Sequence, residues 1–312
     1  AYLVRHETSS DLTPDEIHRL GLTEVERVTG ELREVFGRLG LPGGEPMGFS
    51  INRVAVEGGN VTASPSDPGP VITAYEEYLD LIAPRLPTVF DRLPAAEMAV
   101  LPDPSGGNGG YYSPGSLDGS RPGAFYAGVN GTVPRYSMPS LMYHEGMPGH
   151  HLQLALAAEL GLPLMRSSVH FNGYVEGWAL YAEYLAKELG VYDDDPYGDV
   201  GRLFFELLRA VRLVVDTGLH SKQWTRDQAR EYMEENLGGW TWEVDRYTVM
   251  PAQALGYKIG MLEILRLRAL AEDRLGGAFD LASFHDVVLG NGAVPLETLD
   301  RLVAEWIEAG TA

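Results

Sequence analysis

Three histidines and one glutamate lie within eight residues of this chain, around a Pro-Gly pair. The segment reads Tyr143-His144-Glu145-Gly146-Met147-Pro148-Gly149-His150-His151. Imidazole nitrogens and carboxylate oxygens are common zinc ligands, and a neighbouring carboxylate can take a proton from water that the metal activates. The segment is therefore predicted to bind one zinc ion, with His144 as the first ligand and Glu145 as the general base.

The spacing of these histidines does not suit a regular helix. In a His-Glu-x-x-His helix the histidines are four residues apart, about 6 Å along the axis, so both can reach one ion. From His144 the next histidines are six and seven residues on, and a straight helix would carry them away from the ion. Pro148 removes a backbone N–H, and Gly149 tolerates unusual dihedrals. We therefore expect a bulge at Met147-Pro148.

This bulge favours His150 over His151 as the second ligand. It places Gly149-His150 where Gly-His falls in an uninterrupted His-Glu-x-Gly-His helix. His151 would then contact the substrate or orient a ligand. The alternative is that a helix ends at Met147 and the histidines are ordinary loop residues, but only eight histidines occur in the chain and three of them gather here.

A third ligand is predicted on a following helix, where Glu176 and Glu183 are seven residues apart and share one face. Glu176 is the better candidate because it precedes Gly177, which lets another helix approach closely. The apolar neighbours of Glu176 indicate burial, and a buried carboxylate needs a partner or a metal. Glu183 is expected either to orient a histidine N–H or to join a structural ion pair.

The two motifs together resemble the bacterial family catalogued as domain of unknown function 885. They are His-Glu-x-x-Pro-Gly-His-His-Leu-Gln from His144 and Tyr-Val-Glu-Gly-Trp-Ala-Leu-Tyr-Ala-Glu from Tyr174, and further matches run almost end to end. The resemblance implies a zinc metallopeptidase related to the gluzincins, in which two histidines and a glutamate hold the metal. It also implies that the chain is the C-terminal part of a longer family pattern.

The expected fold is mainly α with a small antiparallel β-sheet, and the resemblance implies a gluzincin-like architecture, as in thermolysin or the oligopeptidases. Residues 1–312 are interpreted as a single catalytic domain. Within it, residues 95–136 form a small β region with an edge strand, and residues 137–312 form a helical region with the metal site. The strand at 123–129, which contains Tyr126, is expected to be the edge strand that pairs with an extended peptide substrate.

Other elements follow from periodicity and from breaker residues. A helix over 25–39 is predicted, with Thr23 and Glu26 as a capping box, followed by a loop over 41–70 with a short strand around Val54. A helix over 70–92 is interrupted near its prolines. Residues 200–217 form a buried helix whose charged side chains make a network.

An oxyanion formed during hydrolysis needs hydrogen-bond donors. Tyr257 is the first choice because its glycine-flanked segment resembles one that faces the metal in related metallopeptidases. His220 is the second, oriented by Asp216 one turn earlier. Arg209 or Arg212 is a candidate for binding a substrate carboxylate, although internal salt bridges explain them equally well. Further candidates for contact with substrate or ligands are Arg121, Gln253 and Lys258.

Composition limits the partners. A formal net charge of −20 argues against nucleic acid and anionic membranes, and no apolar run is long enough to span a membrane. The absence of cysteine excludes thiolate ligands and disulfides. A cytoplasmic location is expected because no secretory signal precedes the first helix, although a removed signal would leave no trace. Oligomeric state is not indicated.

These observations predict a zinc-dependent peptidase that hydrolyses short peptides. The first alternative is another metal-dependent reaction, such as amide hydrolysis or a lyase step on a small metabolite. The second is a binding protein that has lost catalysis, which the intact His144, Glu145, His150 and Glu176 argue against.

Overall fold

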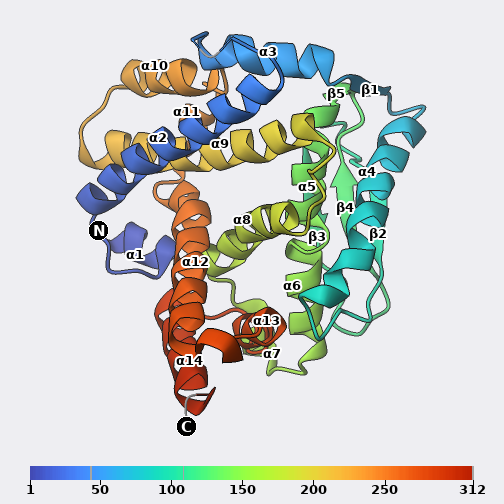
Figure 1. Cartoon of the computed structure of the whole chain (residues 1–312), viewed down its shortest axis with the longest axis vertical. Helices are drawn as coiled ribbons and strands as arrows, with labels where there is room; N and C mark the ends of the chain where they lie inside the picture. Colours follow the sequence, from blue (N-terminus) through green and yellow to red (C-terminus); the bar gives the residue numbers. More distant parts are fainter. Residues whose placement is uncertain (43, 108, 311–312) are drawn as a thin grey trace.

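A computed structural model describes residues 1–42, 44–107 and 109–310, and helices make up most of them (Figure 1). The α-helices are α1 (Tyr2–Thr8), α2 (Pro14–Arg38), α3 (Met47–Glu57), α4 (Gly69–Ile82), α5 (Met138–Glu145), α6 (His150–Glu159), α7 (Leu164–Ser168), α8 (Asn172–Glu188), α9 (Pro196–Ser221), α10 (Arg226–Leu237), α11 (Glu243–Val249), α12 (Gly256–Leu275), α13 (Leu281–Leu289) and α14 (Leu296–Gly310). The strands are β1 (Asn60–Ala63), β2 (Met98–Pro102), β3 (Gly110–Ser113), β4 (Gly123–Ala127) and β5 (Gly131–Pro134). The prediction of a mainly helical fold is confirmed.

Helix α2 is longer than the sequence periodicity predicts, because it begins at Pro14. Its capping box is Thr13 with Glu16, each side chain binding the other residue's backbone N–H, and Pro14 occupies the first turn. Thr23 and Glu26, the predicted cap, lie inside α2, so that prediction is wrong. Inside a helix the backbone N–H groups are already bound to carbonyl oxygens of the preceding turn. A threonine and a glutamate with capping-box spacing therefore have no free N–H groups to bind there.

The segment after α2 is also more helical than predicted. Val54 is fully buried within α3, so neither the loop over 41–70 nor the strand at Val54 is correct. The apolar positions of α3 join the buried cluster of α2, α9 and α10, and α3 packs against α10; this tertiary burial outweighs the glycine and proline content around it. By contrast, the predicted helix from residue 70 is confirmed as α4, which passes into a 3-10 turn at Ala83–Thr88 where the prolines fall.

Two small sheets carry the strands. β1 pairs with β5 in an antiparallel sheet, and β4 lies between a parallel β2 and an antiparallel β3. The prediction that 123–129 is an edge strand is therefore wrong, because both sides of β4 are already hydrogen-bonded. Tyr126 sits in this central strand, with its ring stacked on Tyr111 of β3. The two edge strands of this sheet are β2 and β3.

The buried apolar side chains form two clusters. One lies among α2, α3, α9 and α10, and the other lies among α8, α12, α13, α14 and the sheets. Figure 1 shows α2 and α9 side by side at one end of the molecule, with α12 extending away from them past α8. Among the described residues, no helix combines the length and apolarity that a membrane span requires.

A crossing of α8 and α12 brings distant parts of the chain together. A Cβ added to Gly177 would lie 2.4 Å from the Cα of Gly260, and one added to Gly260 would lie 1.8 Å from the carbonyl oxygen of Gly173. The two backbones touch where all three residues lack side chains. This contact carries Glu176 on α8 and Tyr257 on α12 toward the same point, and it gives Gly177 the role predicted from the sequence.

Candidate metal centre

The histidine segment forms two helices separated by a turn. α5 ends at Glu145, residues 146–149 form the turn with a cis Met147-Pro148 peptide, and α6 begins at His150. The predicted interruption is therefore present at the predicted place. Figure 1 shows α5 and α6 following one another between α8 and the strands.

The turn leaves no room for a side chain at Gly149. A Cβ at this position would lie 2.0 Å from the carbonyl oxygen of His144 and 2.4 Å from that of Tyr143, so any side chain would displace the turn. α8 holds the other side, because the buried indole of Trp178 donates a hydrogen bond of 3.0 Å to the carbonyl oxygen of Pro148. The turn thus folds back onto the end of α5 and directs His150 toward His144.

Three side chains converge at this point. Glu176 Oε2 lies 3.5 Å from His144 Nε2 and 3.4 Å from His150 Nε2, and the three atoms lie within 4.8 Å of one another. Donors at about 2.1 Å from a tetrahedral zinc ion lie about 3.4 Å apart. Glu176 Oε2 is also buried without a hydrogen-bond partner among the described residues. The arrangement can therefore hold one metal ion.

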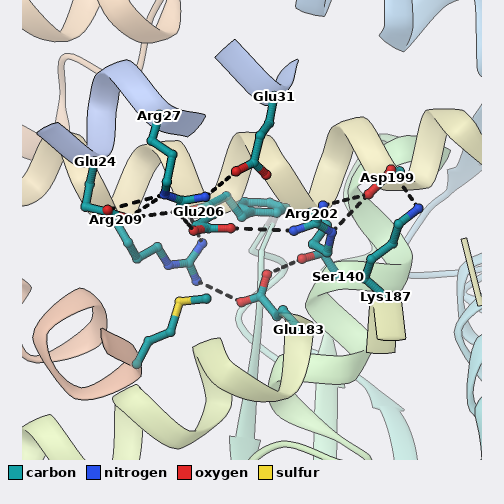
Figure 2. A network of polar contacts seen from close by, with 12 residues as sticks. Glu24, Arg27, Glu31, Ser140, Glu183, Lys187, Asp199, Arg202, Glu206 and Arg209 are labelled. Atoms are coloured by element: carbon teal, nitrogen blue, oxygen red, sulfur yellow. Dashed lines mark hydrogen bonds and ion pairs between the residues drawn. The ribbon is translucent and has the colours of Figure 1, made fainter. Parts of the chain in front are cut away.

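Glu183 fixes the orientation of the His144 ring by binding the nitrogen that faces away from Glu176. His144 Nδ1 donates to Glu183 Oε1 over 2.8 Å, which leaves Nε2 to face Glu176. The hydroxyl of Ser140 donates to Glu183 Oε2, and Arg209 Nη2 lies 3.9 Å from Glu183 Oε1 (Figure 2). Glu183 makes the contacts of both roles expected for it: it accepts the N–H of His144, and it forms an ion pair with Arg209.

The carboxylates also set the charge of the site. Burial alone would lower the pKa of His144, but the neighbouring carboxylates of Glu176 and Glu183 raise it to about 9. Burial opposes ionisation of Glu176, yet the two imidazoles hold its pKa well below its usual range. Uptake of a cation at His144 Nε2 would therefore have to displace a proton.

His151 is turned away from the three converging atoms. Its Nε2 donates to the carbonyl oxygen of Ala96 over 3.1 Å, and its Nδ1 accepts from the hydroxyl of Tyr112 over 3.0 Å. Burial lowers the pKa of this imidazole, consistent with a neutral ring that has one donor and one acceptor. Since both nitrogens are used, His150 is the histidine of this pair that can reach a metal.

Glu145 points toward the sheet. Its Oε2 accepts the backbone N–H of Tyr112 in β3 over 2.9 Å, so this N–H is directed away from β4. Burial raises the pKa of the Glu145 carboxyl, while the neighbouring His144 and His150 act in the opposite direction. A carboxyl group with a raised pKa beside a metal site is suited to accept a proton and then release it.

Tyr257 lies beside the same cluster. Its ring is stacked on that of His144 with 6.2 Å between centroids, and the guanidinium carbons of Arg209 and Arg212 lie 5.5 and 5.1 Å from its centroid. Burial and the charge of Glu176 raise the pKa of the Tyr257 hydroxyl, so it carries a proton at neutral pH. This predicted residue is therefore brought to the site.

His220 and Asp216 are not brought to the cluster by any of their contacts. His220 is exposed near the end of α9, where its Nε2 binds the carbonyl oxygen of Tyr247. Asp216 accepts the backbone N–H of Ala252 over 2.9 Å instead of orienting His220, and burial raises its pKa to about 6. Because α9 continues beyond Arg212 for two turns, it carries these residues away from Tyr257.

Arg209 and Arg212 of α9 have different partners. Arg212 donates to Tyr247 and to Glu243 at 2.9 Å each, so its charge is compensated within the protein. Arg209 Nη1 donates to the carbonyl oxygen of Phe205, and its Nε is buried without a hydrogen-bond partner among the described residues. Both arginines form internal ion pairs, as the alternative interpretation expected: Arg209 Nη2 lies 3.9 Å from Glu183 Oε1, and Arg212 pairs with Glu243.

The other candidates lie in different surroundings. Lys258 is fully buried against Glu206 and Glu24 at 2.6 and 2.9 Å, facing away from Tyr257, so it does not contact the cluster. Gln253 is held by Arg246 and Asn172. Arg121 is exposed and donates to the carbonyl oxygen of Pro114 over 2.7 Å.

Sequence reasoning missed two residues that contact the site. Tyr112 binds both Glu145 and His151, and Ser140 binds Glu183. Ser140 precedes His144 by four residues and so shares its helix face, a signal that was available. Tyr112 gave no such signal, because its proximity depends on how β3 pairs with β4.

Comparisons with known proteins identify the family and the fold of the chain. The model of the family described as "Bacterial protein of unknown function (DUF885)" matches residues 1–303. A solved structure of a "putative lipoprotein" from Colwellia psychrerythraea is 40% identical with a TM-score of 0.93, and covers 99% of this chain. A second, from Shewanella oneidensis and of unknown function, is 20% identical with a TM-score of 0.80 over 96% of the chain, and supports the fold alone.

The chain spans 55% and 58% of the lengths of these two proteins. No curated protein matches it.

Proposed function

The chain belongs to the bacterial DUF885 family, and we propose that it is a zinc-dependent peptidase that hydrolyses short peptides. The observation that carries the proposal is the convergence of His144 Nε2, His150 Nε2 and Glu176 Oε2 within 4.8 Å. The gluzincin-like architecture expected from the sequence is part of the same proposal.

Zinc suits these donors. Catalytic zinc sites commonly have three protein ligands from histidine and carboxylate and leave the fourth position for water or substrate. The buried, unpartnered oxygen of Glu176 would gain a partner, and His144 already has the carboxylate partner that zinc-binding histidines usually have. When bound, zinc would lower the pKa of a water molecule and polarise a carbonyl group.

Glu145 is proposed as the general base. It adjoins His144 in sequence, and it accepts a hydrogen bond only from a backbone N–H among the described residues, so it is free to take a proton from the attacking water. The same carboxyl group would then pass the proton to the leaving nitrogen of the peptide. Its raised pKa favours both transfers near neutral pH.

Tyr257 is proposed to donate its hydroxyl proton in a hydrogen bond to the oxyanion that forms on the substrate carbonyl. The positive charges of Arg209 and Arg212 near its ring would favour negative charge at this point. β3 replaces β4 as the proposed partner of an extended peptide, because its Tyr112 N–H faces Glu145 and away from the sheet.

The test separates metal binding from catalysis. Glu145→Gln is expected to retain one zinc ion per chain but to lose about 10²- to 10⁴-fold in kcat on a peptide library, because only proton transfer is removed. Zinc content is measured by elemental analysis and kcat by product release. His150→Ala is the matched variant and should lose zinc. Full activity of Glu145→Gln, or failure of the parent protein to take up stoichiometric zinc, would contradict the proposal.

The cytoplasmic location expected from the sequence stays a prediction. Both solved structures similar to this chain are described as putative lipoproteins, a description that favours export for those proteins. Cell fractionation followed by immunoblotting decides between the cytoplasm and the envelope.

A further inference from the structure

A cavity of about 820 Å³ opens beside the candidate metal centre. It is bounded by the exposed face of α6, the loop that follows β3, the segment around α7, and Gly292 and Ala293 before α14. Its volume lies in the range of pockets that bind small ligands, about 300–1,000 Å³. None of the three converging ligand residues lines it, so it is a neighbouring space with its own walls.

Helix α6 carries residues of both the metal centre and the wall of the cavity. Gln153 and Leu154 line it, and they follow His150 by three and four residues on α6, so all three share one face of the helix. Tyr112, which also lines the cavity, gives its backbone N–H to Glu145. A peptide held at the base and the metal ligands would therefore have an adjoining side chain directed into this space.

Three of the charged side chains that line the cavity are bound to the main chain of the protein. Arg166 donates to the carbonyl oxygen of Asn291 over 2.8 Å, and Arg121 donates to that of Pro114. Glu159 accepts the backbone N–H groups of Ala95 and Ala96. An apolar part of the wall is formed by Leu154, Ala155, Ala157, Ala158, Leu162 and Val169, and Glu97, Asp118 and His170 line other parts of it.

One buried polar atom at the metal end of the cavity has no partner. Gln153 is 2% exposed, its Nε2 donates to the carbonyl oxygen of Tyr174, and its Oε1 makes no hydrogen bond to a described residue. A buried acceptor in this condition is costly unless a ligand supplies a donor. The N–H of a peptide is such a donor.

From these contacts we infer that the cavity binds a bulky apolar side chain of the substrate next to the scissile bond, while Gln153 Oε1 accepts a peptide N–H. The inference rests on the proposed function, because it assigns a substrate class to the same site. Substrates with phenylalanine or leucine at this position are preferred over those with alanine or aspartate.

The experiment narrows the cavity without touching the metal ligands. Quenched fluorescent peptides carry alanine, phenylalanine or aspartate at each position around the cleaved bond, and kcat/KM is measured for zinc-loaded protein. The unmodified protein should prefer phenylalanine over alanine at least tenfold at one position. Ala158→Trp, an exposed position on α6, should reduce this preference at least tenfold. Ala309→Trp, exposed on α14 and outside the cavity, should leave it unchanged.

A binding measurement keeps failure of this inference distinct from failure of the proposed function. Calorimetry on zinc-loaded Glu145→Gln compares N-acetylphenylalanine amide with N-acetylalanine amide. Tighter binding of the phenylalanine compound that Ala158→Trp removes would support the pocket even if no peptide is cleaved. Gln153→Leu should weaken both compounds about threefold to tenfold without changing the preference. Peptide cleavage with an unchanged preference in Ala158→Trp, or equal binding of the two amides, would overturn the inference.

Discussion

His144 has a separate partner for each ring nitrogen, and this division decides which nitrogen can reach a metal. Nδ1 is tied to Glu183, so Nε2 is the atom presented to Glu176 and His150. Glu183 is itself fixed by Ser140. A rotation of the imidazole would break a buried hydrogen bond to a carboxylate, a contact typically worth about 1.5–3 kcal/mol. The ligand is therefore oriented before any ion arrives.

Removing the Glu183 carboxylate should weaken metal binding without removing a ligand. Glu183→Ala is expected to raise the zinc dissociation constant about 10- to 100-fold, the usual effect of losing a carboxylate that orients a metal-binding histidine. Competition with a chromogenic chelator measures this constant. Glu305→Ala, which removes an exposed carboxylate paired with Arg301, is the control and should have no effect. A change of less than threefold in Glu183→Ala would contradict the orienting role.

At this scale the sequence predicted the converging residues better than their surroundings. Spacing and the Pro-Gly pair were enough to prefer His150 over His151, and burial plus Gly177 were enough to prefer Glu176. The role of His151 was not predictable, because both of its partners, Ala96 and Tyr112, are far from it in sequence. The prediction that His220 reaches the site was wrong for a related reason. A one-turn spacing shows that Asp216 and His220 are neighbours on a helix, but it does not show which part of the protein that helix turn faces.

The crossing of α8 and α12 is the element-scale feature on which the site depends. Glu176 and Gly177 are adjacent on α8, and Tyr257 is one turn before Gly260 on α12. The closeness of Gly177 to Gly260 therefore determines how near Tyr257 comes to Glu176 and His144. Without that contact each helix would still form, but the hydroxyl and the ligands would not share one space.

Gly177→Ala should consequently disturb both stability and chemistry. The added methyl group meets backbone atoms of Gly260, which cannot rotate away, so a loss of about 1–3 kcal/mol of unfolding free energy is expected, as for other overpacked sites. The displaced α12 should also lower kcat more than zinc affinity. Urea denaturation, zinc titration and peptide hydrolysis measure the three quantities.

The matched control is Gly30→Ala within α2. A Cβ there meets no described atom within 4 Å, so alanine should raise the unfolding free energy by about 0.5–1 kcal/mol through its better helix propensity. Equal effects of the two substitutions would show that the α8–α12 contact tolerates a side chain.

Elements with strong helical periodicity were predictable, and those that depend on distant partners were not. The start of α4 was predicted to within one residue and both ends of α9 to within four, because their apolar faces repeat regularly. α3 was missed because glycine and proline around it suggested a loop, while its burial in the cluster with α2, α9 and α10 became visible only in the structure. The place of β4 in the middle of its sheet depends on β2 and β3, and short strands carry no sequence signal of their order.

On the scale of the whole molecule, buried charges on α9 connect the two apolar clusters. Glu206 binds Lys258 of α12 and Arg27 of α2, and Arg202 on its own helix lies 3.5 Å away. Figure 2 shows Glu206 with Arg27 and Arg202, together with Asp199 bound by Arg202 and Lys187. Each cation in this network is compensated by a carboxylate, so loss of one carboxylate leaves positive charge buried.

Glu206 should therefore make the stability of the protein sensitive to acid. Burial opposes its ionisation, but Lys258 and Arg27 lower its pKa from 4.5 to about 2. A carboxyl group with a lowered folded-state pKa stabilises the protein fully above its unfolded-state pKa, here worth about 3 kcal/mol, and this contribution is lost as the pH falls from 4.5 toward 2.

Glu206→Gln tests this contribution, because it keeps the shape of the side chain and removes its charge. At pH 7 the variant should lose about 3–5 kcal/mol of unfolding free energy, since Lys258 and Arg27 keep only their weaker remaining partners. At pH 3 the difference from the unmodified protein should be about 2 kcal/mol smaller, because the unmodified protein has then lost part of the same contribution. Asp245→Asn, in the exposed pair with Arg226, should change stability little at either pH. A difference between Glu206→Gln and the parent that stays constant from pH 7 to pH 3 would mean that the network holds the helices together by packing and not by charge.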